Sequence, residues 1–232
     1  MQLIFYDHRG NGRSAPLDDF TGIDHKTWAD DADALRAHLG HEKIILLGHS
    51  CGGFVALEHA RRHGENLAGL ILCCTAPAMD YPGVIMAKAQ ARSTPEQLQL
   101  VVKAFTQPLT SDEEFRGLYE RIFSLYFKAY DPKTGGDIVN AVRYNYHAFN
   151  YSASTWFPAF NSLSWLSEIS IPTLIIGGRE DWVMPPEQGA ERLHAGIPNS
   201  ELVIFDNSGH MPFVEEQGRF NKVVVEWIAG LK

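Results

Sequence analysis

The stretch KIILLGHSCGG at residues 43–53 decides the fold of this chain. Its first part, residues 43–48, is an apolar run typical of strands that are buried on both faces of a parallel sheet. A helical pattern begins at residue 54. The G-x-S-x-G pentapeptide between them puts a serine on a sharp, strained strand-to-helix turn. We therefore predict that Ser50 is a nucleophile at the carboxyl end of the sheet.

The neighbours of Ser50 have predicted parts in this turn. Side chains at the flanking Gly48 and Gly52 would collide with the adjoining strand and helix. Cys51 opens the helix, so its backbone N–H can stabilise negative charge that develops on a reacting oxygen. We predict Cys51 as an oxyanion-hole donor through its backbone, not as a rival nucleophile. His49 is expected to pack under the site or to touch substrate.

The rest of the chain alternates short apolar runs with longer amphipathic stretches. The other predicted strands are residues 3–6, 67–73, 173–177 and 201–205. The predicted helices are residues 28–39, 54–63, 187–194 and 215–229. Strands that alternate with helices of this length form βαβ units, which build one sheet covered by helices on both faces. The sequence therefore predicts an α/β fold with a doubly wound, mainly parallel sheet.

Residues 77–166 interrupt the alternation, because no buried strand is evident there. The stretches TPEQ at residues 94–97 and SDEE at residues 111–114 are capping boxes that start helices. We predict a helical cap at residues 77–166, inserted into a core formed by residues 1–76 and 167–232. The segment is rich in aromatic residues, which either fill the core of the cap or line an apolar substrate pocket beneath it.

Two further strand ends carry the residue types that a serine nucleophile needs. A serine hydroxyl reacts poorly at neutral pH without a neighbouring base. His210, in the loop after the last predicted strand, is the candidate base, and Asp181, after the strand at residues 173–177, is the candidate acid that orients it. Carboxyl ends of parallel strands share one edge, and the chain order Ser, Asp, His is that of α/β-type serine hydrolases.

Two other carboxylates compete for the role of the acid. Glu180 precedes Asp181 by one residue and would point elsewhere on a short turn. Asp206 lies close to His210 in sequence, but Asp206-Asn207 is more simply a turn former. Asp181 is therefore the preferred acid.

Composition and net charge argue against some classes of binding partner. Its net charge of −8 over 232 residues, with no run of lysine or arginine, argues against nucleic acid or an anionic membrane as partner. Three cysteines make no disulfide framework, and Cys73 and Cys74 read as buried small side chains. Without a signal-peptide pattern or a run of ~20 apolar residues, we expect a cytoplasmic protein that acts on a small molecule.

No metal or cofactor is predicted. His59 and His63 stand four residues apart on a predicted helix, a spacing that could hold a metal ion. No acidic or cysteine partner pattern accompanies them, so the sequence favours a solvated helix face at these positions.

The stretch YDHRGNGRS at residues 6–14 resembles the D-x-R-G-x-G-x-S loop of the α/β-hydrolase superfamily, especially the branch of proline iminopeptidases, small esterases and lactonases. GHSCGG, GGREDWVMPP and NSGHMPF extend the resemblance over the chain apart from the cap. It implies that Ser50 forms an acyl-enzyme, that His210 takes and returns the proton, and that Asp181 stabilises the imidazolium. The expected reaction is hydrolysis of small to medium, apolar esters or of lactones.

Two departures from this family leave alternatives open. Proline iminopeptidases typically carry a tryptophan after the nucleophile, where this chain has Cys51. Their recognition of a free amine needs acidic groups in the cap, and aminopeptidase activity is the alternative function. The acidic candidates are Asp112, Glu113, Glu114 and Glu120.

The second departure is at the N-terminus. Family members usually have further strands and a His-Gly oxyanion loop before the D-x-R-G region, whereas this chain begins almost on it. We expect either that the sequence is incomplete at its N-terminus or that an N-terminally shortened core has adapted. As a hypothesis, residues 3–6 pair with residues 43–48, and the backbone of residues 8–11 supplies the second oxyanion donor. A non-catalytic binding protein is a further alternative, and a free strand edge would favour a homodimer.

Overall fold

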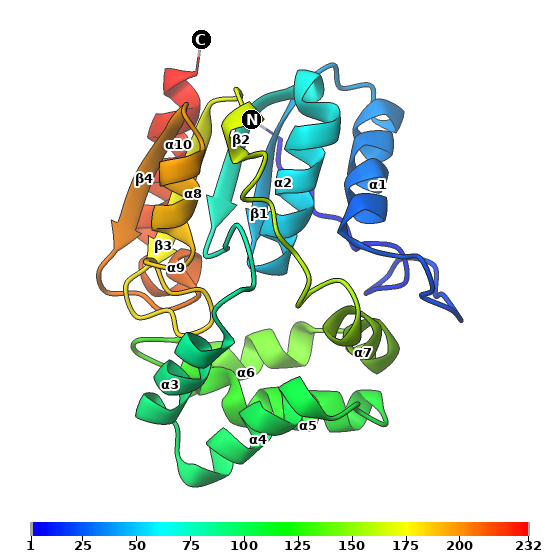
Figure 1. Ribbon diagram of the computed structural model, residues 1–232, viewed down its shortest axis with the longest axis vertical. Helices are drawn as coiled ribbons and strands as arrows, with labels where there is room; N and C mark the ends of the chain where they lie inside the picture. The colour runs from blue at the N-terminus through cyan, green and yellow to red at the C-terminus, as the bar shows by residue number, and fades with distance from the viewer. Residues whose placement is uncertain (1, 232) are drawn as a thin grey trace.

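Four strands form one parallel sheet in the computed structural model, which describes residues 2–231 (Figure 1). They are β1 (Ile44–His49), β2 (Leu67–Cys73), β3 (Thr173–Gly178) and β4 (Ser200–Phe205), and they lie side by side in chain order. Cys73 pairs with His49 on one side and with Ile176 on the other, so the carboxyl ends of these strands meet at one edge. These four predicted strands and the α/β fold are confirmed.

Alternate side chains of β2 point to two cores on opposite faces of the sheet. Leu70 and Leu72 belong to the core shared with α1 (His25–His38), α2 (Cys51–His63) and α8 (Ala190–Gly196). Ile71 and Cys73 belong to the core that α10 (Gln217–Gly230) covers with Trp227. Burial of each large aliphatic side chain stabilises the fold by about 1.5–3 kcal/mol. The strand is therefore apolar along its whole length rather than at every second residue.

Between β2 and β3 the chain forms a layer of helices beyond the carboxyl ends of the strands, drawn in green in Figure 1. Its helices are α3 (Pro82–Arg92), α4 (Pro95–Thr106), α5 (Asp112–Ile122), α6 (Pro132–Ala141) and α7 (Tyr146–Ser154), with the 3-10 turn η2 (Phe123–Tyr126). A bridge between Ala78 and Asn161 joins the chain where it enters and leaves this layer. Helical structure is thus confirmed for the inserted segment, while the division into core and cap stays a prediction.

The two predicted capping boxes differ in outcome. At the start of α4, the Thr94 hydroxyl accepts a bond from the Gln97 N–H, and the Gln97 side chain accepts one from the Thr94 N–H. At the start of α5, the Ser111 hydroxyl accepts from the Glu114 N–H at 3.0 Å. The Glu114 carboxylate, however, accepts from the Thr110 N–H at 2.6 Å instead of reaching back to Ser111. Only the first box is complete.

The predicted strand at residues 3–6 is wrong, and so is its hypothesised pairing with residues 43–48. The chain forms no strand over residues 2–24, and within residues 2–231 β1 pairs with β2 alone. Phe5 is 85% exposed. The segment is held instead by side chains, since His8 stacks on Trp28 of α1 with ring centroids 4.9 Å apart. Without a neighbouring backbone to complete its ladder, an apolar run does not become a strand.

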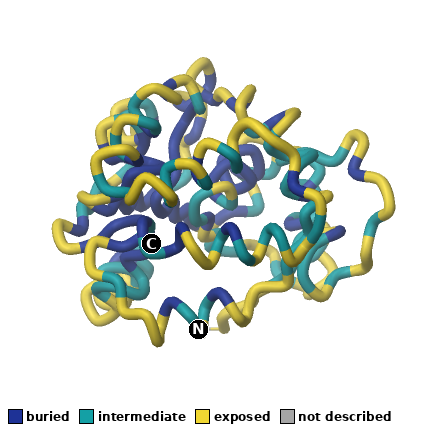
Figure 2. Tube along the Cα trace, turned by 90° about the horizontal axis from the view of Figure 1, so that it is seen from below, coloured by how far each residue is buried: buried dark blue, intermediate teal, exposed yellow. Residues whose placement is uncertain are grey.

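Short elements complete the structure: η1 (Gly64–Asn66), η3 (Leu166–Glu168) and α9 (Pro212–Glu215). Buried segments gather in the middle of the molecule and exposed turns form its outline (Figure 2). Cys73 and Cys74 are buried free thiols, as predicted. Over residues 2–231, no helix has the length and apolarity that a bilayer crossing requires.

Candidate active site

Ser50 sits on a strained turn between β1 and α2. Its φ of 54° and ψ of −124° lie where residues with a side chain are rarely found, at a cost of about 1–3 kcal/mol. The turn is fixed to the sheet, because the Ser50 N–H donates to the Cys73 carbonyl at 3.0 Å. Ser50 is also the N-cap of α2, yet its side chain makes no capping bond. The hydroxyl is therefore available for other chemistry.

Close packing explains the glycines of this turn, though not at both predicted positions. A Cβ on Gly48 would lie 2.3 Å from the Gly52 carbonyl oxygen, so a side chain at Gly48 collides with the start of the helix as predicted. A Cβ on Gly52 would meet no atom within 4 Å, which makes that prediction wrong. The second close approach is at Gly53, where a Cβ would lie 2.3 Å from the Thr75 Oγ1.

Asp181 and His210 form a buried hydrogen-bonded pair. The His210 Nδ1 lies 2.6 Å from the Asp181 Oδ2, and the two residues are 2% and 1% exposed. The other oxygen, Oδ1, accepts bonds of 2.9 Å from the backbone N–H groups of Val183 and Met184. Burial raises the pKa of Asp181, but the charge and hydrogen bond of His210 and these N–H groups outweigh it and lower the pKa below its ordinary value.

This pairing assigns the protons on the two side chains. Because Asp181 is an ionised carboxylate, it can only accept, so the His210 Nδ1 carries the hydrogen of the bond. In the neutral imidazole the Nε2 is then an acceptor. His210 is thereby prepared to take a proton through Nε2.

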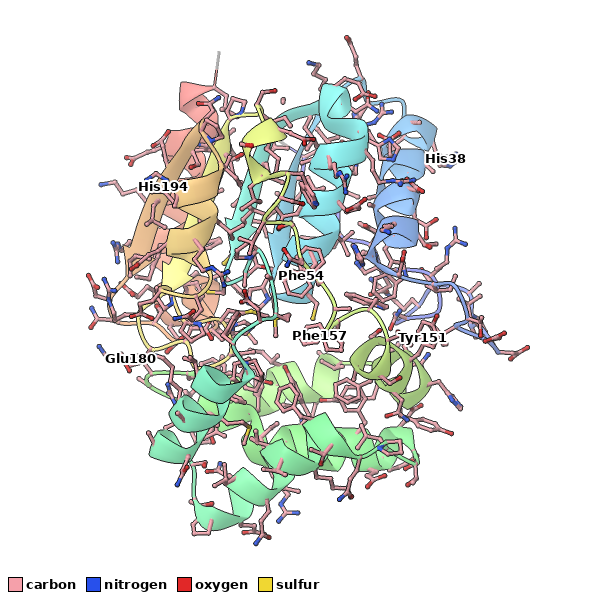
Figure 3. All side chains as sticks on the ribbon, in the orientation of Figure 1. His38, Phe54, Tyr151, Phe157, Glu180 and His194 are labelled. Atoms are coloured by element: carbon pink, nitrogen blue, oxygen red, sulfur yellow. The ribbon has the colours of Figure 1, made fainter. Side chains whose placement is uncertain are left out.

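The two rivals of Asp181 lie on the outside of the molecule. Glu180 is exposed, and Figure 3 labels it at the outer edge of the sheet layer. Asp206 is exposed too and pairs with Arg179 at 3.1 Å. Neither carboxylate is bonded to His210, whereas Asp181 is, and the role of Asp181 as the acid stays a prediction.

His49 connects the serine turn to the loop at residues 206–211, which carries His210 and is called the histidine loop below. Its Nε2 lies 2.8 Å from the His210 carbonyl oxygen, and the two imidazole rings have centroids 4.7 Å apart. Burial, with the neighbouring His210, lowers the pKa of His49 to about 3, so its ring is neutral and donates from Nε2. Since His49 precedes Ser50 directly, this contact brings the serine turn against the loop of the candidate base. His49 thus packs against His210, and its alternative role in touching substrate stays a prediction.

The helical layer packs against the histidine loop through Tyr126. The sequence did not reveal this contact. The His210 N–H donates to the Tyr126 carbonyl at 2.6 Å, and the Tyr126 ring lies edge-on to both His210 and Trp182. A Cβ on Gly209 would lie 2.4 Å from the same carbonyl oxygen. The glycine before His210 was the one sequence signal of this close approach.

The two predictions about oxyanion donors, Cys51 and the loop of residues 8–11, have different outcomes. Cys51 is the first residue of α2, so its backbone N–H has no acceptor within the helix. In the loop of residues 8–11, the Asn11 N–H donates to the His8 carbonyl at 2.9 Å and the Gly10 N–H to the Ala15 carbonyl at 3.2 Å. The loop therefore uses these two N–H groups internally, which overturns their hypothesised role as the second donor.

His59 and His63 do not lie on a solvated face, contrary to the sequence expectation. The His59 side chain is fully buried and the His63 side chain is 24% exposed, because α1 packs over this side of α2. The His63 Nε2 lies 2.7 Å from an oxygen of Asp30, and the His59 Nε2 lies 3.7 Å from one of Asp33. These acidic partners stand about 30 positions away in the chain, so spacing alone could not reveal them.

Another group of potential metal ligands lies at the candidate active site. Ligand atoms of His49, Cys74 and His210 are within 4.8 Å of one another. Each histidine bonds a protein group through one ring nitrogen, His49 through Nε2 and His210 through Nδ1. Burial raises the pKa of the Cys74 thiol well above its ordinary value, which keeps it in the neutral form that binds metals poorly. These three residues lie next to one another at the candidate site.

Comparisons with known proteins identify the family to which the chain belongs. The family model described as alpha/beta hydrolase fold matches residues 1–217. The chain is 30% identical to the proline iminopeptidase PfmaB of Pestalotiopsis fici, covering 98% of this chain and 80% of that protein, and 30% identical to a proline iminopeptidase of Clostridium botulinum, covering 97% and 80%. An esterase from Exiguobacterium antarcticum superposes with a TM-score of 0.78 at 26% identity, over 97% of this chain and 80% of that one. The chain therefore belongs to the α/β-hydrolase fold family.

Proposed function

We propose that this hydrolase-family protein cleaves carboxylic esters through an acyl-enzyme on Ser50. The observation that carries the proposal is the buried hydrogen bond between Asp181 and His210, at the same edge of the sheet as the strained turn of Ser50. A buried carboxylate that holds an imidazole in one tautomer is what a serine needs in order to be deprotonated as it attacks. The solved esterase structure with the same fold supports an ester as substrate.

In the proposed mechanism His210 first acts as a base. Its Nε2 takes the Ser50 proton while Oγ attacks the ester carbonyl carbon, and Asp181 stabilises the imidazolium that forms. The oxyanion of the tetrahedral intermediate receives the Cys51 N–H at the positive end of α2. His210 then protonates the leaving alcohol. A water molecule repeats the sequence on the acyl-enzyme and releases the acid.

Aromatic residues beside the site support an apolar substrate of small to medium size, or a lactone. Phe54 of α2 and Phe157, which follows α7, have ring centroids 5.6 Å apart. Figure 3 labels Phe54 beside α2 and Phe157 between the sheet layer and the helical layer. Tyr126 adds its ring against His210. Apolar side chains around a few oriented polar groups are typical of small-molecule sites. The helical layer would thus act as a cap over the substrate.

The direct test is hydrolysis of a short-chain aryl ester by the wild type and by Ser50→Ala. The proposal expects measurable turnover by the wild type and a loss of about 10⁴-fold or more in the variant, because a triad acts as a unit. Equal rates for the two proteins would end the proposal.

Removal of an N-terminal proline from peptides is the second candidate function, favoured by the names of the two relatives. Against it, two of the four acidic candidates have structural partners: Asp112 accepts from the Tyr146 N–H, and Glu114 accepts from the Thr110 N–H. A prolyl anilide assayed beside the aryl ester distinguishes the two functions. We expect the ester to have the higher kcat/KM, and a higher value for the anilide would replace our assignment.

A further inference from the structure

One carboxylate ties the loop of the candidate base to the helical layer. The Oε2 of Glu215, the last residue of α9, accepts a bond of 2.7 Å from the Gly209 N–H, directly before His210. Its Oε1 accepts from the Lys128 N–H at 2.7 Å and from the Ala129 N–H at 3.3 Å. Both oxygens are therefore engaged, one by the histidine loop and the other by the segment that follows η2.

We propose that Glu215 is a positioning residue for His210: it clamps the histidine loop against residues 126–129 of the helical layer and so fixes the imidazole over the serine turn. The inference rests on the proposed function, since it assigns His210 the role of general base. It adds a residue that touches neither substrate nor reacting atoms.

The histidine loop and residues 126–129 are packed closely against each other. Gly209 has no room for a Cβ, which would lie 2.4 Å from the Tyr126 carbonyl oxygen. That oxygen accepts the His210 N–H at 2.6 Å. The backbone of the loop thus lies on the backbone of η2, and the Glu215 carboxylate joins the loop to the segment that follows η2.

The chemistry of the carboxylate suits this role. Burial raises the pKa of Glu215, and the N–H groups that it binds oppose this rise by favouring its charged form. Hydrogen bonds to a charged acceptor are stronger than those between neutral groups. A glutamine has nearly the same shape but offers only one acceptor oxygen, so it must turn an NH₂ toward either Gly209 or Lys128. Glu215→Gln therefore breaks one side of the clamp while filling the same space.

Arg92 of α3 links the segment that follows η2 to the loop that carries Asp181. Its guanidinium donates to the Phe127 carbonyl at 2.6 Å and also to the Glu180 carbonyl, next to Asp181. The segment after η2 is thereby linked to both partners of the buried pair. Placement of the acid and the base depends on the helical layer as well as on the sheet.

The test compares Glu215→Gln with Glu226→Gln, the same exchange at an exposed position of α10. Hydrogen exchange at the Gly209 and Lys128 amides, followed by NMR, reads the clamp itself. The chemical shift of the His210 Nδ1 proton, which lies in the bond to Asp181, reads the position of the imidazole. The rate of Ser50 labelling by a fluorophosphonate and the kcat and KM for the ester read the activation of the serine.

For Glu215→Gln we expect faster exchange at Gly209 or Lys128 by tenfold or more, a shifted Nδ1 proton, and labelling and kcat lowered about tenfold to hundredfold, with KM changed less than threefold. Glu226→Gln should match the wild type in every readout. Unchanged exchange, or kcat and labelling within twofold of the wild type, overturns the inference.

A second variant and a separate criterion for the proposed function complete the test. If Glu215→Gln does not fold, Glu215→Asp keeps the charge but is too short to reach both sides, and the same changes are expected. If the wild type neither reacts with the fluorophosphonate nor cleaves esters, the proposed function fails. The exchange rates and the Nδ1 proton still decide whether Glu215 holds the histidine loop.

Discussion

The Asp181 carboxylate and the His210 imidazole meet at 2.6 Å in the interior of the protein, although 29 positions separate them in the chain. Each follows a different strand of the sheet, and β3 and β4 are parallel neighbours whose carboxyl ends coincide. The fold thus turns two distant loops into one hydrogen-bonded pair, and the predictions below depend on it.

Replacing Asp181 by asparagine should lower kcat for ester hydrolysis by about 10⁴-fold, with a small effect on KM. The amide keeps the shape of the side chain but can donate toward the imidazole, which favours the tautomer that cannot take the Ser50 proton. Steady-state kinetics check this. The matched exchange Asp206→Asn, at the exposed rival position, should leave kcat within about twofold, and a comparable loss there would contradict the assignment of the acid.

A methyl group at Gly48 should disrupt the serine turn. Gly48→Ala puts a Cβ 2.3 Å from the Gly52 carbonyl oxygen, a backbone atom that cannot move without shifting the start of α2. We expect the free energy of unfolding to fall by about 1–3 kcal/mol, the usual cost of overpacking, with a loss of activity. Gly136→Ala in α6, where a Cβ meets no atom within 4 Å, is the control. Equal denaturant midpoints for the two variants would refute the prediction.

His59 should make the protein less stable in acid. Burial, and then the neighbouring His63, lowers its pKa in the folded state from 6.5 to about 4. Below pH 6.5 the unfolded chain binds a proton that the folded protein does not, so stability falls until the pH reaches about 4. The full loss is of the order of 3 kcal/mol.

The check is the pH dependence of denaturant unfolding for the wild type and His59→Phe. Relative to its own stability at pH 7.5, the variant should lose less between pH 6.5 and 4, because it lacks the titrating group. Parallel stability curves would show that His59 has no part in the acid sensitivity.

Removing an aromatic ring between the sheet and the helical layer should change substrate preference. Phe157 packs on Phe54 between the sheet and the helical layer. We expect Phe157→Ala to lower kcat/KM for an aryl hexanoate more than for the corresponding acetate, since one or two lost apolar contacts cost about 1–3 kcal/mol. Equal losses for both esters would indicate that the ring does not line the acyl site.

The sequence predicted what depends on local pattern. The run at residues 43–48, followed by the glycine-bearing turn, specified β1, the turn and the start of α2, because buried parallel strands are apolar throughout. The order Ser50, Asp181, His210 followed from three polar positions after three such runs. The structure adds the contact that joins two of them, a 2.6 Å bond inside the protein.

What the sequence did not predict depends on partners far away in the chain. Residues 3–6 look like a strand, but their backbone has no neighbouring strand and Phe5 is exposed. His59 looked solvated because nothing near it in sequence foretold that α1 would cover it. The Tyr126 carbonyl and the Glu215 carboxylate hold the histidine loop through backbone groups, which leave almost no trace in residue identity.

The most direct test of the account is reaction of the intact protein with a fluorophosphonate, followed by mass spectrometry of its peptides. An activated serine reacts readily, whereas an ordinary surface serine does not. The account predicts one phosphonyl group on the peptide that contains Ser50, no labelling of Ser50→Ala, and much slower labelling of Asp181→Asn. A wild-type protein that remains unlabelled, or that carries the group on another residue, would contradict the proposal that Ser50 is the nucleophile.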